Sequence, residues 1–125
     1  MVPLIIAGLS LYLKQFTPAL TAPETKEVHL RNLTWVEVRS LIERGKTTVI
    51  IPTAGIEQNG PHVVLGKHGY VVEYTASAIA RALKNTLVAP TIETVPEGPI
   101  DPPGGHMKFA GTISLPEEVF ELILE

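Results

Sequence analysis

Apolar residues recur at helical spacing in several stretches of the chain, and the first two of these predict amphipathic helices. One helix is predicted from Thr34 to Gly45, because Thr34 and Glu37 form the capping-box pattern and Gly45 supplies a left-handed residue at its end. A second helix is predicted over 70–84, with Asn85 as its C-terminal cap. Each helix has a single apolar stripe, so each should pack one face on a core.

Two short apolar runs, 47–51 (TTVII) and 86–89 (TLVA), lie on either side of the second predicted helix, and each is followed by a proline. Neither run alternates with polar residues, which is typical of strands covered on both faces. The order strand, loop, helix, strand predicts a βαβ unit with parallel strands. The chain is therefore expected to be a layered α/β protein.

Two loops rich in glycine and proline, 52–69 and 90–111, follow the carboxyl ends of these strands. In a parallel sheet both loops emerge at the same edge, where α/β proteins usually bind their ligands. Long ordered loops commonly serve function. This edge is the candidate site.

A third helix is predicted to begin around Pro116, because Ser114 and Glu117 repeat the capping-box pattern. The preceding residues, 112–115, are expected to form a short strand or a turn. The sequence stops at Glu125, after about two turns and without a capping residue. We therefore expect a domain truncated at its C-terminus, with its remaining part outside this sequence.

The uncharged run 1–13 (MVPLIIAGLSLYL) is shorter than the roughly 18 apolar residues of a membrane-spanning helix, so no membrane span is expected. Its length fits the apolar region of a secretory signal. Residues 1–22 are thus either a signal peptide, which would make the protein periplasmic or secreted, or an apolar N-terminal arm of a cytoplasmic protein. Residues 23–32 are polar and are predicted to be a linker, which leaves 33–125 as the folded part.

Composition narrows the possible functions. The 125 residues suffice for one domain, and ten basic against thirteen acidic residues give a net charge of -3, which disfavours nucleic-acid binding. The chain has no cysteine, so disulfides, thiolate zinc sites and cysteine nucleophiles are excluded. A metal site would have to use His, Glu, Asp or Asn.

Candidate metal ligands gather in the two loops: Glu57, Asn59, His62, His68 and His106. Zinc and manganese bind neutral imidazole and carboxylate, and a loop shaped by glycine and proline can hold such ligands in place. The alternative is that these histidines are solvated loop residues. Neither GxGxxG nor GxxxxGK[ST] occurs, which disfavours a nucleotide site, and the lack of GxSxG disfavours a serine hydrolase.

Three ordered motifs carry a family resemblance. Residues 57–62 (EQNGPH), 65–68 (LGKH) and 109–115 (FAGTISL) resemble the E-Q-H-G-P-H, L-G-T-D and F-P-G-T-I-S-L motifs of the creatininase (creatinine amidohydrolase) family. The resemblance covers about 33–125. It implies a three-layer αβα fold with a mainly parallel sheet. It also implies a hydrolase, often oligomeric, in which two divalent ions hold a hydroxide that attacks a C–N bond.

The family's metal ligands are only partly retained. Glu57 stands unchanged at a ligand position, whereas Asn59 replaces a ligand His and His68 replaces the Asp that bridges two ions. Asn binds more weakly than imidazole, and His cannot bridge two ions as a carboxylate can. The resemblance therefore implies one or two ions, Zn or Mn, with a single ion on Glu57 and His68 favoured. The family's other ligands would lie beyond Glu125.

Four further residues of the loops have weaker assignments. His62 matches the family's P-H and is expected to orient its loop rather than bind metal. His106 is expected to bind substrate or to donate a hydrogen bond to a ligand, or else to be solvated. Glu97 and Asp101 are expected to be loop caps and surface charges.

The resemblance implies a metal-dependent amidohydrolase acting on a small cyclic or linear amide, in which metal-activated water attacks the carbonyl. The alternative is a degenerate, non-catalytic family member that serves as a ligand-binding or oligomerisation module. Stoichiometric metal that disappears in Glu57→Ala would favour the enzyme. In either case homo-oligomers are expected.

Overall fold

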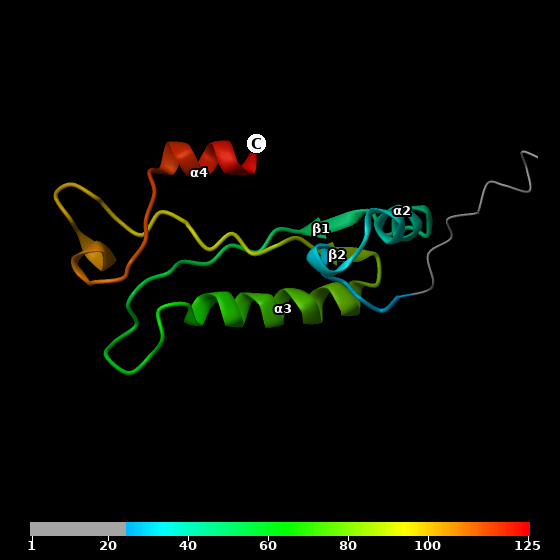
Figure 1. Cartoon of the computed structure of the whole chain (residues 1–125), viewed down its shortest axis with the longest axis horizontal. Coiled ribbons are helices and arrows are strands. Elements are labelled where there is room, and N and C mark those ends of the chain that lie inside the picture. Colours follow the sequence, from blue (N-terminus) through cyan, green and yellow to red (C-terminus); the bar gives the residue numbers. More distant parts are fainter. Residues whose placement is uncertain (1–24) are drawn as a thin grey trace, which may run out of the picture.

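A computed structural model describes residues 25–125. Figure 1 shows an elongated arrangement in which a long helix, α3, runs beside a short sheet, and the last helix, α4, lies on the opposite side of the extended loops. The signal peptide or arm predicted for residues 1–22 lies outside the described residues. Among the described residues, none of the helices has both the length and the apolar character that crossing a membrane requires.

The sheet has two parallel strands joined through a helix. β1 (Thr48–Ile50) pairs with β2 (Thr86–Val88), and α3 (Lys67–Leu83) lies between them in the chain. Thr48 stands opposite Thr86 in the register. The α/β class, the parallel pairing and the strand–helix–strand order are therefore confirmed.

The core lies where α3 packs on β2. Two small residues of the helix, Ala76 and Ala80, are buried against Val88, and Ile50 of β1 packs against the same cluster. Alanine lets the helix backbone approach the strand closely, because it adds only one methyl group. Figure 1 shows the sheet beside the C-terminal half of α3, while the extended chain that follows β1 runs along the N-terminal half of the helix.

The prediction of a polar linker over 23–32 is wrong in its described part. Val28 belongs to the buried core, and its carbonyl accepts a hydrogen bond of 2.8 Å from the Val88 N–H. His29 forms a parallel bridge with Val88, and Leu30–Asn32 form a 3-10 turn, η1. One buried apolar residue among polar ones gives no periodic pattern, so the sequence could not indicate this strand-like segment.

The first predicted helix is confirmed as α2 (Trp35–Glu43). The Glu37 N–H donates to Thr34 Oγ1 at 3.3 Å, and the Thr34 N–H donates to Glu37 Oε2 at 2.8 Å, which completes the capping box. Gly45 has a φ of +94°, as a left-handed residue after the helix requires. Local sequence signals therefore define both ends of α2.

The C-terminal cap predicted for the second helix is wrong by one residue. Lys84, with a φ of +66°, is the left-handed cap of α3. Asn85 instead begins the sheet: its carbonyl accepts from the Thr48 N–H, and its Oδ1 accepts from the Thr86 hydroxyl. Strand pairing has overridden the local capping preference of asparagine.

The two strands differ in burial. All residues of β2 are buried, as predicted. β1 is not covered on both faces, because Val49 is 48% exposed and Ile51, just beyond the strand, is 53% exposed. β2 lies between β1 and the segment around Val28, which makes β1 an edge strand within the described part of the chain.

The last helix forms as predicted, but its cap does not. In α4 (Glu117–Leu124) the N-cap is Pro116, and Ser114 makes no capping hydrogen bond. The Ser114 hydroxyl instead accepts from the Glu97 N–H at 2.8 Å, so it holds the second loop. Within the predicted strand or turn at 112–115, Ile113 forms an antiparallel bridge with Ile56.

Candidate metal centre

Glu57 is the central acidic residue of the candidate site. Its chain segment leaves β1 beside the second loop, with a hydrogen bond from the Ala54 N–H to the Ile92 carbonyl. On its other side, the Ile113 N–H donates to the Ile56 carbonyl at 2.9 Å. These bonds hold Glu57 between two segments that are distant in sequence, and Glu57 is only 3% exposed.

His68 lies against Glu57, as the sequence predicts for the carboxyl end of the first strand. Its Nδ1 contacts Glu57 Oε1, with the His68 side chain 45% exposed and that of Glu57 only 4%. His68 is the second residue of α3, and Gly60, with a φ of +85°, helps the intervening loop to turn back. The site thus joins a buried carboxylate to an accessible imidazole.

Asn59, in the loop after β1, and Lys67, the first residue of α3, support Glu57. The Asn59 amide donates to the Glu57 carbonyl at 3.0 Å and to Glu57 Oε1 at 3.2 Å. Lys67 Nζ donates to Asn59 Oδ1 at 2.6 Å. In this arrangement the amide oxygen of Asn59, the atom expected to bind metal, is engaged by an ammonium group. The role of Lys67 was not predicted from the sequence. Its position next to His68 in the LGKH motif could have indicated that it lies close to the site.

The second oxygen of Glu57, Oε2, is buried without a hydrogen-bond partner. It faces Gly55: a Cβ at that glycine would lie 2.7 Å from Glu57 Oε2 and 2.6 Å from the Cδ of Glu97. Two carboxylates therefore converge on the space that Gly55 leaves open. Carboxylates this close repel each other unless a proton or a cation lies between them.

Glu97 is thus part of the site, and its assignment as a loop cap or surface charge is wrong. Burial raises the pKa of its carboxyl, and the nearby Glu57 raises that pKa further, while His106 and His68 partly offset the increase. The contact spans forty positions of sequence and depends on the path of a long loop, so no local pattern indicates it. Asp101 is exposed, in agreement with a surface charge.

The other two histidines differ in their distance from this cluster. His106 lies in the 3-10 turn η2 (Gly105–Lys108), close enough to influence the carboxyl of Glu97. His62 is exposed in the turn after Gly60, and no hydrogen bond between His62 and Glu57 occurs in the described residues. Their predicted roles in substrate binding or ligand support remain predictions.

A cavity of about 480 Å³ adjoins His68. Its wall is mainly apolar and is formed by residues after β1, by the first turns of α3 and by one residue of α4: Thr53, Ala54, Gly55, His68, Val71, Val72, Thr75, Val95 and Phe120. A cavity of this kind suits a small molecule with apolar groups. It places such a molecule beside the exposed face of the His68 ring.

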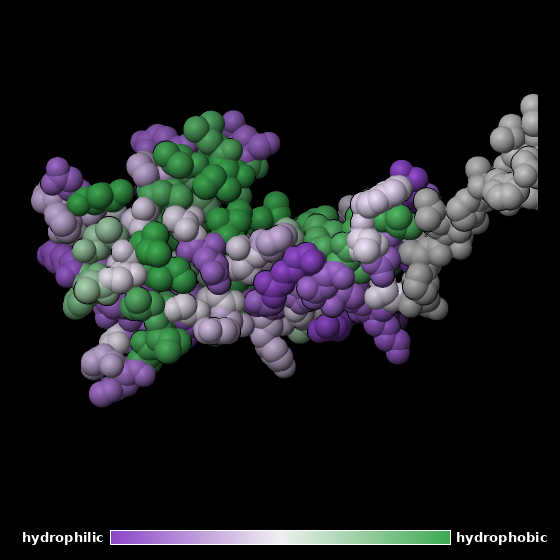
Figure 2. Space-filling model, in the orientation of Figure 1, coloured by the Kyte–Doolittle hydropathy of each residue, from purple (hydrophilic) through white to green (hydrophobic). Residues whose placement is uncertain are grey.

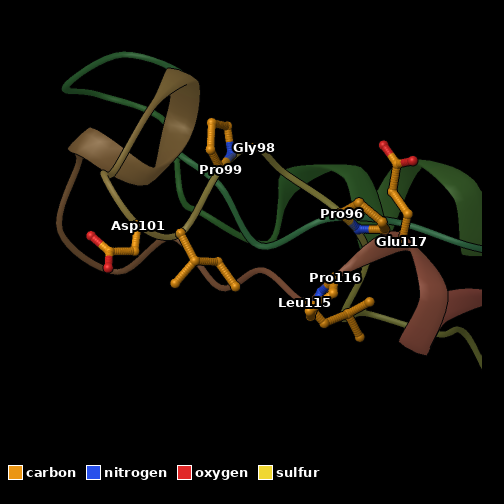
Figure 3. A pocket seen from close by; sticks show the side chains of 8 residues that line it. Pro96, Gly98, Pro99, Asp101, Leu115, Pro116 and Glu117 are labelled. Atoms are coloured by element: carbon orange, nitrogen blue, oxygen red, sulfur yellow. The ribbon is translucent and has the colours of Figure 1, made fainter.

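A second cavity, of about 550 Å³, lies between the proline-rich loop and the start of α4. Figure 3 shows Asp101 and Glu117 at opposite ends of it, with Pro96, Leu115 and Pro116 along its wall. None of the Glu57, His68 and Glu97 side chains lines this cavity. We place the chemistry at the cavity of about 480 Å³, because His68 and Gly55, which adjoin the Glu57 carboxylate, line it.

The donor set fits a divalent ion in part. Glu57 offers an unpaired buried oxygen, Oε2, and the Glu97 carboxylate lies on the same side, whereas His68 contacts the other oxygen, Oε1. Carboxylate and imidazole groups suit zinc or manganese. In the described part of the chain, no three His, Asp or Glu side chains are grouped closely enough to form a complete ion site. A bound ion would therefore need a small movement of these side chains or further ligands.

The comparisons with known proteins agree with this architecture. The family model for creatininase, described as creatinine amidohydrolase, matches residues 31–125. Comparison with curated proteins gave no match.

Several solved creatininases are similar in structure. A crystal structure of creatinine amidohydrolase is 24% identical, with a TM-score of 0.65 over 79% of this chain and 39% of that one. A Zn-Zn type mutant creatininase is 25% identical (TM-score 0.62; 73% and 34%), and a mutant creatininase complexed with creatine is 26% identical (TM-score 0.60; 72% and 34%). A creatininase described as the Mn form is 24% identical (TM-score 0.65; 75% and 36%).

The parallel strand pair, with a helix between its strands, and the family-model match define an α/β protein of a known family. The chain belongs to the creatininase family. It spans between a third and two fifths of the length of the solved creatininases described above.

Proposed function

We propose that this chain carries part of the active site of a metal-dependent hydrolase that cleaves a small amide at its C–N bond. The observation that supports it best is the buried Glu57 carboxylate, with one oxygen on His68 and the other unpaired. An unpaired buried carboxylate oxygen is costly, and a cation would remove that cost. Family membership supplies the reaction class.

Glu57 and His68 would hold a single Zn²⁺ or Mn²⁺ ion. When bound, such an ion lowers the pKa of water and polarises the amide carbonyl. Asn59 orients the Glu57 carboxylate through its amide, and Lys67 fixes the orientation of Asn59. The two polar residues therefore set the direction in which the buried carboxylate points.

The cavity beside His68 would take the substrate. Its apolar wall, with Val72 on α3 and Phe120 on α4, suits an uncharged ring or a methylated amide. The relative complexed with creatine shows that one solved family member accepts a small guanidino compound. We propose a substrate of similar size, with its carbonyl directed toward His68.

The test is to measure metal content and amide turnover together. Bound Zn and Mn should be determined by elemental analysis for the wild type and for Glu57→Gln, which keeps the side-chain volume and removes the charge. Asp101→Asn is the matched control, because it also removes one carboxylate charge and Asp101 is exposed. We expect Glu57→Gln to lose both metal and turnover of cyclic amides such as creatinine, and Asp101→Asn to retain both. Wild-type protein without bound metal would contradict the proposal.

One observation favours the second candidate, a non-catalytic ligand-binding member. The amide oxygen of Asn59 is taken by Lys67, so a position that binds metal elsewhere in the family is engaged differently here. Such a protein would bind a small amide in the cavity without turning it over. Calorimetry that detects binding of the amide by metal-free protein, together with no turnover after Mn²⁺ addition, would favour this candidate.

A further inference from the structure

The carboxylate of Glu97 reaches the site from the second loop, and Gly55 makes room for it. A Cβ at Gly55 would collide with Glu97 Oε1 and would lie only 2.7 Å from Glu57 Oε2. Any other residue at position 55 would therefore separate the two carboxylates. Gly55 has no positive φ that would require glycine, so space is the physical reason for a glycine here.

Two hydrogen bonds hold Glu97 in this place. The Glu97 N–H donates to Ser114 Oγ at 2.8 Å, and the Ser114 hydroxyl lies 3.4 Å from the Gly98 carbonyl. The neighbouring Ile113 is bridged to Ile56, one residue before Glu57. The segment that positions Glu97 is thus attached to the segment that positions Glu57, so their approach is built into the backbone.

The polar groups around Glu57 leave one side of it unsatisfied. Oε1 contacts His68 and accepts from Asn59, whereas Oε2 has no partner and points to the gap at Gly55. Glu57 is more than nine-tenths buried, so water does not solvate this oxygen freely. An ion placed at this gap would be bound by an oxygen of each carboxylate.

We propose that Glu97 is a ligand of the divalent ion that Glu57 binds. It supplies from the second loop the carboxylate that position 68, a histidine in this chain, does not provide. The inference rests on the proposed function, since it needs an ion at Glu57. It places the carboxylates of Glu57 and Glu97 on that ion, while His68 contacts the other oxygen of Glu57.

The test is a titration of the full chain with Mn²⁺, in which electron paramagnetic resonance measures the concentration of free ion. Glu97→Gln removes the charge at nearly constant volume, and Asp101→Asn is the control, because it removes an exposed charge from the same loop. Gly55→Ala changes no ligand but fills the gap, so it provides a second, independent variant. Circular dichroism should establish that each variant is folded.

We expect Glu97→Gln and Gly55→Ala each to weaken Mn²⁺ binding at least about tenfold, since even an outer hydrogen-bond partner of a ligand contributes that much. Asp101→Asn should bind like the wild type. The rise in unfolding temperature that Mn²⁺ gives the wild type should shrink in both variants.

The possible failures are distinguishable. If Glu57→Gln abolishes binding while Glu97→Gln binds like the wild type, the role of Glu97 is wrong and the proposed function stands. If the wild type binds no Mn²⁺ or Zn²⁺, both are wrong. In that case a higher unfolding temperature for Glu97→Gln would indicate that the two carboxylates repel each other with no ion between them.

Discussion

At the scale of single residues, the arrangement around Glu57 shows how one substitution changes a site. Asn59 stands where the family motif has histidine, and its amide group donates to the carboxylate while its oxygen binds Lys67. Imidazole is a stronger ligand for zinc than an amide oxygen. The side chain at position 59 therefore decides whether this position supports Glu57 or binds metal itself.

This leads to a prediction for Asn59→His. The variant should bind Zn²⁺ about tenfold more tightly than the wild type, because it adds an imidazole beside Glu57. Isothermal titration calorimetry measures the change directly. Gln58→His is the control, since it adds the same ring at the neighbouring position. Equal affinities for Asn59→His and the wild type would show that position 59 faces away from the ion.

A second residue-scale prediction concerns Glu27. Hydrogen bonds from the His29 N–H and the Asn32 side chain lower the pKa of its carboxyl below 4.5. Because the folded-state pKa is lowered, its stabilisation is present above the ordinary pKa and is lost as the pH falls through the folded-state value. Between about pH 6 and about pH 3.5, urea unfolding should show a larger loss of stability for the wild type than for Glu27→Gln.

The control is Glu43→Gln, at an exposed position near the end of α2. It should retain the acid sensitivity of the wild type. If Glu27→Gln were equally acid-sensitive, the hydrogen bonds to the Glu27 carboxylate would not contribute to stability.

The family resemblance indicated part of the site. Glu57 and His68 could be paired before the structure was known, because the resemblance places both positions on one ion and the loop between them turns back. Glu97 could not be paired with them, since its contact depends on Gly55 and on a hydrogen bond to Ser114 from far along the chain. Short-range sequence patterns predict turns and helix caps, whereas the approach of Glu97 to Glu57 depends on how two long loops pack.

At the scale of elements, two similar sequence patterns have different outcomes. Thr34 and Glu37 form the predicted capping box, whereas Ser114 and Glu117 do not. Pro116 is itself the N-cap of α4, and the Ser114 hydroxyl is used by the second loop. A local motif is reliable only where no long-range partner competes for its side chain.

The capping box of α2 gives the third prediction. Thr34→Ala should lower the free energy of unfolding by about 1 kcal/mol, because the Glu37 N–H loses its acceptor. Thr47→Ala is the matched control, since Thr47 is exposed and lies outside any helix. Urea unfolding followed by circular dichroism measures both. Equal stabilities for the two variants would contradict a stabilising role for this cap.

At the scale of the whole molecule, apolar surface is distributed unevenly. Figure 2 shows hydrophobic residues gathered over α4, and Leu122 is 70% exposed there. Val49 and Ile51 are also about half exposed at the sheet edge. The helices and the parallel pair could be predicted from the sequence. The uncovered face of β1 could not, because an apolar run does not reveal what covers it.

The last prediction is that the 125-residue chain associates in solution. Exposed apolar side chains on α4, and the edge of β1 that no other described residue pairs with, would both be stabilised by contact with another chain. Sedimentation velocity should show the average mass rising with concentration, and Leu122→Lys should reduce this association by placing a charge in the exposed apolar surface of α4. Glu118→Gln is the control, because it changes the net charge by the same amount and leaves the apolar surface intact. A wild type that stays monomeric at high concentration would contradict self-association through these surfaces.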